Sequence, residues 1–179
     1  MANFRQLIRL NEEKQEMGYG AGVCIFCPKT GRFLLQKRGP NVDDAGEHDW
    51  FGGGVDEGED ILEGAVRELL EEGGIEAPPE HLYPLARFGY QPEKGLGGYF
   101  IWLLVVADEF EAIPNWDGDT HDEVEGFDWI GAKEWGSITP HERVFVLFSD
   151  PTFVETLKKA TKDRIDTDHV AKLKQGRGE

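Results

Sequence analysis

Three glutamates in one short segment have the residue type and the spacing of a divalent-metal site. Glu68, Glu71 and Glu72 lie at positions i, i+3 and i+4, so on a helix they share one face within a single turn. Their mutual repulsion weakens an isolated helix, but carboxylate oxygens are the ligands that Mg²⁺ and Mn²⁺ prefer. Acidic helix faces are also common on protein surfaces that bind no ion, so the spacing alone leaves both interpretations open.

The residues around these glutamates predict the helix that positions them. We expect a helix over residues 60–72, because apolar residues recur there at i, i+3, i+4, i+7 and i+8. The expected core-facing residues are Leu62, Ala65, Val66, Leu69 and Leu70. Gly73 and Gly74 supply a left-handed cap that ends the helix. On this arrangement the glutamates lie away from the core, and we expect Glu72 to be a surface ligand.

Residues 53–75 resemble the Nudix box, G-x5-E-x7-R-E-U-x-E-E-x-G-U, in which U is a bulky aliphatic residue. Every specified position is filled, by Gly53, Glu59, Arg67, Glu68, Leu69, Glu71, Glu72, Gly74 and Ile75. A weaker similarity extends to residues 34–38 and 125–130, so the resemblance covers residues 18–135. Many relatives have a proline just before the glycine pair, where this chain has Gly52. We therefore expect a looser loop there, with no ligand lost.

The resemblance implies a metal-dependent hydrolase acting on pyrophosphate linkages. Glu68, Glu71 and Glu72 would bind Mg²⁺ together with the backbone carbonyl of Gly53, and Mn²⁺ would substitute for it. A metal-activated water would attack one phosphorus of the pyrophosphate, while the metal neutralises charge developing on the oxygens.

Two further box residues have structural roles by the same resemblance, and one catalytic role is left open. Arg67 would hold the geometry of the loop and the helix by pairing with Glu59. The general base varies within the family. The leading candidates are Glu68 on the helix and Glu125 in the segment before Trp129; Glu123 and His121 are weaker candidates.

The rest of the chain predicts a β-rich domain around the helix. A turn sequence at residues 28–31 separates two apolar segments, which indicates a β-hairpin. In the first of these strands Cys24 and Cys27 are an odd number of residues apart and face opposite sides, so we expect two core thiols and no zinc site. The expected strands span residues 19–27, 32–37, 83–90, 98–107 and 124–130, and further helices span 132–136 and 141–162, the second broken near 149–151.

These elements and the box together indicate an α/β fold, a Nudix-type α/β/α sandwich with a mixed β-sheet. We expect an N-terminal arm or short helix at residues 1–17, the Nudix hydrolase domain at 18–163 and a polar C-terminal tail at 164–179.

Candidate substrate contacts lie outside the box. Arg38 is suited to clamp a phosphate, although a solvent-facing strand end is an equal alternative. An aromatic group could include a base-stacking platform, with about half of it in the core. Its members are Phe88, Tyr90, Tyr99, Phe100 and Trp102. In some subfamilies a proline or tyrosine beyond the box is a substrate hint, but Tyr90 and Pro92 are both present here, so the hint does not decide.

The expected substrate is a small nucleotide, with a preference for (deoxy)nucleoside triphosphates, including damaged ones. Seventeen residues before the domain cannot supply the extra N-terminal sheet that ADP-ribose pyrophosphatases often carry. ADP-ribose, nucleotide sugars and dinucleoside polyphosphates remain alternatives, as does a non-catalytic nucleotide-binding module. An RNA decapping enzyme that contacts RNA through its basic tail is a third alternative.

Charge argues against a long nucleic acid partner. The formal net charge is −16, and residues 158–179 hold seven basic against four acidic residues, so the body of the chain is more acidic still. Such a body repels nucleic acid phosphates.

The first residues lack the apolar region of a signal peptide, and the longest apolar run, 100–107, is too short to span a bilayer. We expect a soluble cytoplasmic monomer or homodimer with no membrane partner.

Overall fold

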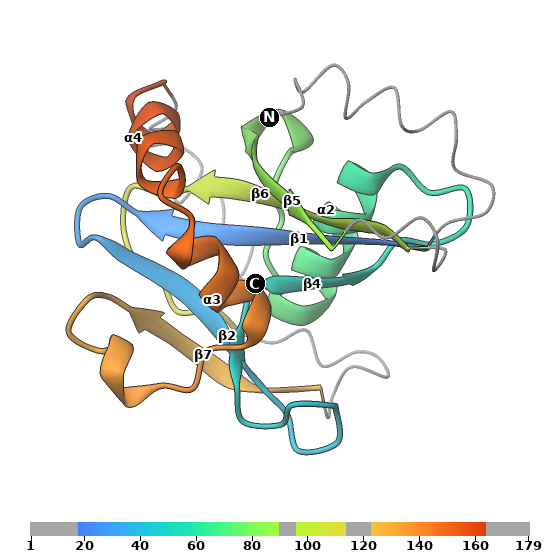
Figure 1. Cartoon of the computed structure of the whole chain (residues 1–179), viewed down its shortest axis with the longest axis horizontal. Helices are drawn as coiled ribbons and strands as arrows, with labels where there is room; N and C mark the ends of the chain where they lie inside the picture. Colours follow the sequence, from blue (N-terminus) through green and yellow to red (C-terminus); the bar gives the residue numbers. More distant parts are fainter. Residues whose placement is uncertain (1–17, 90–95, 114–122, 164–179) are drawn as a thin grey trace, which may run out of the picture.

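The strand β1 (Gly18–Cys27) runs through the centre of the sheet (Figure 1). It is parallel to β6 (Leu96–Val105) along one edge. Along its other edge it is antiparallel to two strands in succession, β4 (Phe51–Gly54) and β2 (Arg32–Arg38). The computed structural model describes residues 18–89, 96–113 and 123–163.

The two strands that share one edge of β1 diverge from each other. The first half of β1 pairs with β4, from Gly20 opposite Gly54 to Val23 opposite Phe51. The second half pairs with β2, beginning at Ile25. The two strands therefore pair with successive parts of the same edge of β1, and no pairing joins β2 to β4. We call this opening between β2 and β4 the split in the sheet. This split is the feature of the fold that positions the candidate site.

The remaining strands extend the sheet on both sides. β5 (Leu82–Phe88) pairs with β6, whereas β3 (His48–Asp49) and β7 (Val124–Ile130) both pair with β2. The described residues therefore form one mixed sheet of seven strands. Short 3₁₀ segments lie at η2 (Pro79–His81) and η5 (Trp135–Ser137).

Helices cover both faces of this sheet (Figure 1). α2 (Ile61–Gly73) packs on one face, over a core that includes Ala21, Val23 and Ile25 of β1. α3 (Glu142–Ser149) and α4 (Phe153–Asp163) pack on the other, over a core that includes Cys24. The α/β/α sandwich with a mixed sheet predicted from the sequence is confirmed.

The cysteines behave as the strand period requires. Cys24 belongs to the core under α3 and α4, and Cys27 to the core under α2. Both are free and buried, so the prediction of two core thiols is confirmed. Burial raises the pKa of Cys24 well above its ordinary value, which keeps this thiol protonated and unreactive.

Two details of the expected elements are wrong. Leu70 is 38% exposed, and Ile61 is buried in its place. The buried residues of α2 include Ile61, Ala65 and Leu69 at i, i+4 and i+8, so its inward stripe is centred one position before the expected one. The helix expected at residues 132–136 is only the 3₁₀ segment η5.

Candidate active site

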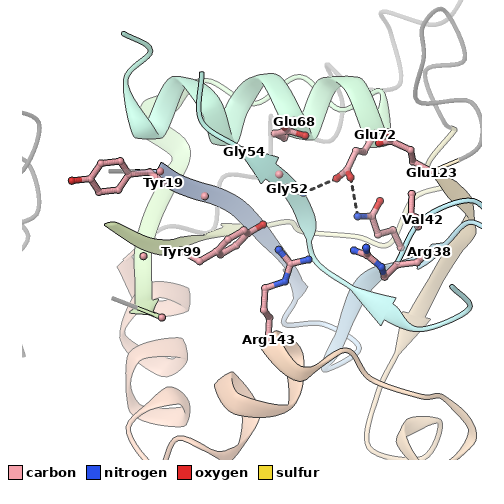
Figure 2. Close-up of a pocket in the computed structure, with 16 residues that line it drawn as sticks. Tyr19, Arg38, Val42, Gly52, Gly54, Glu68, Glu72, Tyr99, Glu123 and Arg143 are labelled. Atoms are coloured by element: carbon pink, nitrogen blue, oxygen red, sulfur yellow. Dashed lines mark hydrogen bonds between the residues drawn. The ribbon is translucent and has the colours of Figure 1, made fainter. Parts of the chain in front are cut away.

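A cleft of about 720 Å³ opens at the split in the sheet. Glycines at the start of β1 and in β4 line it, α2 and Glu123 just before β7 contribute acidic side chains, and β2 and α3 contribute basic ones (Figure 2). The side chains that line it are Tyr19, Gln36, Arg38, Val42, Glu68, Glu72, Tyr99, Glu123 and Arg143. Residues of β1, β2, β4, β6, α2 and α3 therefore meet at one cavity.

Glu72 closes the split from the side of α2. Its Oε2 accepts a hydrogen bond from the backbone N–H of Gly52 in β4 at 2.6 Å, and its Oε1 accepts one from Nε2 of Gln36 in β2 at 3.1 Å (Figure 2). The residue is only 8% exposed, so the expectation that Glu72 lies on the surface is wrong. The physical reason is the split itself, which admits a polar side chain where a continuous sheet would not.

This position changes the acidity of Glu72. Burial raises the pKa of its carboxyl to about 8, against the lowering effect of the two N–H donors. Nearby negative charge on Glu68 and Asp49 adds to the rise. A bound cation would relieve both effects, because it favours the ionised form.

Glu68 lies one turn earlier on α2, against the backbone of Gly53. A Cβ at position 53 would lie 2.7 Å from Oε1 of Glu68, so a larger residue would have to displace this carboxylate from its present position. Burial raises the pKa of Glu68 although Arg67 opposes the rise, and the charges of Glu71 and Glu123 contribute to it. Negative charge is thus concentrated at the cleft wall beside an exposed glycine backbone.

Arg67 ties the loop before the helix to the helix itself. Its Nε donates to Oε1 of Glu59 at 2.9 Å, and its Nη2 donates to the carbonyl of Gly54 at 2.9 Å. Its Nη1 donates to Glu68 at 2.9 Å and to Glu71 at 3.0 Å. The pairing of Arg67 with Glu59 that the resemblance implied is present. Arg67 also pairs with Glu68 and Glu71, two of the three box glutamates.

The described part of the box fits a hard divalent cation. Glu68 and Glu72 both line the cleft with Gly53, and carboxylate and carbonyl oxygens are the donors that such ions take. Glu71 is different, since its side chain is 44% exposed, is paired with Arg67 and does not line the cleft. Gly74 has φ of 58° and caps α2, as the glycine pair predicted.

A second group of potential metal ligands lies apart from the box. One ligand atom from each of Asp44, Glu47 and His141 lies within 4.8 Å of the others. Nδ1 of His141 accepts from the backbone N–H of Arg143 at 3.2 Å, and Nε2 lies 3.4 Å from Oδ2 of Asp44 in an ion-pair contact. Both ring nitrogens of His141 thus already have partners in the protein, so the group adds no argument for a metal there.

The candidate bases differ in their placement. Glu123 lines the cleft, and its charge acts on Glu68. Glu125, two residues along the chain, is exposed, pairs with Nζ of Lys37 at 2.7 Å and does not line the cleft. The geometry therefore favours Glu123 over the sequence-based choice of Glu125, while His121 lies outside the described residues.

The candidate substrate contacts also differ in whether they line the cleft. Arg38 lines the cleft, whereas Phe88 stacks on Tyr99 with ring centroids 5.7 Å apart and does not. Phe100 and Trp102 lie in the core under α2. Tyr90 and Pro92 lie outside the described residues.

Two residues at the site have no signal in the sequence pattern. Arg143 lies in the first turn of α3, far along the chain from the box, and lines the cleft. Asp49 is fully buried and pairs with both Arg143 and Arg38. Neither residue belongs to a motif. From the sequence alone, a single aspartate at the end of a polar segment is interpreted as an ordinary loop residue.

Comparison with known proteins agrees with the fold and the box. An RNA pyrophosphohydrolase from Shewanella piezotolerans is 40% identical over 72 residues, which are 38% of this chain and 37% of that protein. One from another Shewanella species is 28% identical over 130 residues, 63% of this chain and 70% of that protein. The chain thus spans little more than a third of the first of these relatives.

The solved structure of a Nudix hydrolase from M. smegmatis shares the fold, with a TM-score of 0.53 and 19% identity over 83% of this chain and 87% of that one. Among the described helices, none has the length and apolar character needed to cross a membrane. The NUDIX domain family matches residues 17–152, three quarters of the chain, and the protein belongs to this family.

Proposed function

We propose that the protein is a divalent-metal-dependent pyrophosphohydrolase that cleaves the pyrophosphate linkage of small nucleotides. The observation that carries this proposal is the pair Glu68 and Glu72. Both line the cleft, and burial raises the pKa of both carboxyls. Buried carboxylates that must ionise in a cleft are typical of sites that hold a cation.

The residues in the cleft that would hold Mg²⁺ are Glu68 and Glu72 with the carbonyl of Gly53, and Glu71, outside the cleft, joins this set by the resemblance alone; Mn²⁺ has the same preference for oxygen ligands. When bound, such an ion neutralises charge on phosphate oxygens and makes water a stronger nucleophile. Arg67 keeps Glu68 and Glu71 in place through its hydrogen bonds. For the general base we favour Glu123, because it lines the cleft and Glu125 does not, while Glu68, the other candidate, is assigned to the metal.

A (deoxy)nucleoside triphosphate, including a damaged one, is the substrate class that we favour. The cleft volume of about 720 Å³ lies within the range of pockets for small molecules, about 300–1,000 Å³. ADP-ribose, nucleotide sugars and dinucleoside polyphosphates are also small phosphoanhydrides, so they belong in the same test.

The 5′ end of RNA is a second candidate, because both curated relatives are named RNA pyrophosphohydrolases. A net charge of −16 opposes binding of a long polyanion. An RNA substrate would therefore have to be held by its terminal phosphates more than by its chain.

A substrate panel tests the proposal. Phosphate or pyrophosphate release is measured with and without Mg²⁺ on canonical and oxidised nucleoside triphosphates, ADP-ribose, nucleotide sugars, dinucleoside polyphosphates and 5′-triphosphorylated RNA. Products are identified directly. We expect Mg²⁺-dependent cleavage to a nucleoside monophosphate in the triphosphate class. Equilibrium binding of the same compounds without any turnover would instead favour a nucleotide-binding module.

A further inference from the structure

The cleft wall opposite the glutamates carries two arginines (Figure 2). Arg38 ends β2, and Arg143 reaches up from the first turn of α3. Both guanidinium groups contact the same carboxylate oxygen, Oδ2 of Asp49: Nη1 of Arg38 at 3.3 Å, and Nη2 of Arg143 in a close ion pair. The Asp49 side chain is 1% exposed, whereas those of Arg38 and Arg143 are 18% and 22% exposed. The carboxylate is therefore enclosed, and the arginines face the cavity.

The charges of this group do not cancel. Two guanidinium groups share one carboxylate, which leaves an excess positive charge at the wall. Asp44 does not neutralise it through any ion pair with these arginines, because its ion pair is with His141. Glu72, across the cleft, acts on Arg143 only through space and raises its pKa together with Tyr99 and Asp49, against the effect of burial.

Each arginine also keeps N–H donors that no described group accepts. Nε of Arg38 donates to the carbonyl of Asp43 at 2.8 Å, and Nε of Arg143 lies 3.4 Å from Nδ1 of His141. Within the described parts of the chain, Nη2 of Arg38 and Nη1 of Arg143 have no hydrogen bond or ion pair. The guanidinium of Arg143 lies over the ring of Tyr99, with its Cζ 4.6 Å from the ring centroid, and this contact restrains it.

We propose that Arg143 and Arg38 form an anion site that binds the phosphates of the substrate facing away from the glutamates. The inference rests on the proposed function, since its ligand is the same nucleotide. A restrained guanidinium with unused donors is suited to phosphate, which accepts several charge-assisted hydrogen bonds at once. If the ion pairs with Asp49 served only to anchor α3, Arg143 alone would be enough, and the second arginine, Arg38, would not be needed.

The arrangement defines a substrate class. A phosphate chain that lies across the cleft has one phosphate beside Glu68 and Glu72 and another beside the arginines. The ligand must then carry at least two linked phosphates, and a monophosphate product can satisfy only one side. We expect tight binding of triphosphates and of inorganic tripolyphosphate, and weak binding of nucleoside monophosphates.

Substitution of the arginines tests the site. Arg143→Gln and Arg38→Gln remove the charges, and Arg143→Lys keeps a charge without the planar fork. Arg32→Gln is the matched control, because Arg32 is a partly exposed arginine that pairs with Glu134 at 2.9 Å and does not line the cleft. For each full-length protein we would measure kcat and KM on the best triphosphate, equilibrium binding of tripolyphosphate and the thermal unfolding midpoint.

We expect Arg143→Gln to raise KM and to weaken tripolyphosphate binding, each by about tenfold or more, the usual cost of losing a hydrogen bond to a charged group. Arg38→Gln should act in the same direction, Arg143→Lys should recover part of the loss, and the control should match the wild type. A folded Arg143→Gln protein with unchanged KM and unchanged tripolyphosphate binding would overturn the site while leaving the proposed hydrolase intact. A wild type that hydrolyses nothing, yet loses tripolyphosphate binding on Arg143→Gln, would support the site and reject the hydrolase.

Discussion

At the scale of single residues, Glu72 combines two properties that the box spacing alone does not reveal. It is a metal-ligand candidate, and it also joins β2 to β4 through Gln36 and Gly52. Both properties depend on its burial. The ionised carboxyl is costly in the metal-free protein, because burial is the largest cause of its raised pKa.

The pH dependence of stability follows from this shift. The pKa of Glu72 is raised to about 8 in the folded protein, so its favourable contribution is complete below the unfolded pKa and is lost as the pH rises through about 8. We expect the unfolding midpoint of the metal-free protein to fall as the pH rises from about 4.5, the ordinary pKa of a glutamate, to about 8, and to show no further loss from Glu72 above that pH. In Glu72→Gln, which cannot ionise, the fall should be smaller. Thermal unfolding in EDTA checks this, and equal slopes for both proteins would contradict it.

Glu123 and Glu125 form a matched pair for locating the base. They are two residues apart, but only Glu123 lines the cleft, and Glu125 is paired with Lys37. We expect Glu123→Gln to lower kcat by about 10²-fold, within the range for a lost general base, and Glu125→Gln to change it little. Steady-state kinetics on both variants decide the matter. The reverse order would restore Glu125, the base predicted from the sequence.

At the scale of elements, the close approach of β4 to α2 sets the geometry of the acids. The space beside Gly53 is filled by the Glu68 carboxylate. We expect Gly53→Ala to displace that carboxylate and to lower kcat/KM by about tenfold or more, as small misplacements near the chemistry do. Gly126→Ala on β7 is the control, since a Cβ there meets nothing within 4 Å. Full activity in Gly53→Ala would mean that the position of Glu68 is not critical.

Elements specified by local pattern could be predicted from the sequence. Turn residues, caps and periodicity predict the β1–β2 hairpin, the bounds of α2 and the break between α3 and α4. The predicted bounds lie within a few residues of the observed ones. The split between β2 and β4 could not be predicted, because it depends on which strands share an edge of β1. For the same reason the burial of Glu72 and the meeting of Asp49 with Arg143 were missed. Their partners are distant in sequence and carry no motif.

At the scale of the whole molecule, an anionic substrate must enter a protein with a net charge of −16. Long-range repulsion opposes its approach. The cleft counters this locally with Arg38 and Arg143 on one wall and, on our account, with a divalent ion on the other. The cation is therefore expected to be indispensable to turnover.

The most direct test is the Mg²⁺ dependence of turnover in the wild type and in Glu72→Gln on the best substrate of the panel. Folding of both proteins is verified by thermal unfolding, because Glu72 also bridges two strands. We expect the wild type to turn over only with Mg²⁺ or Mn²⁺, and the folded variant to lose activity by about 10³-fold or more at any Mg²⁺ concentration, a loss of several kcal/mol of transition-state stabilisation. Wild-type activity that persists in EDTA, or a variant that keeps full activity with Mg²⁺, would contradict the assignment of the box glutamates as a metal site.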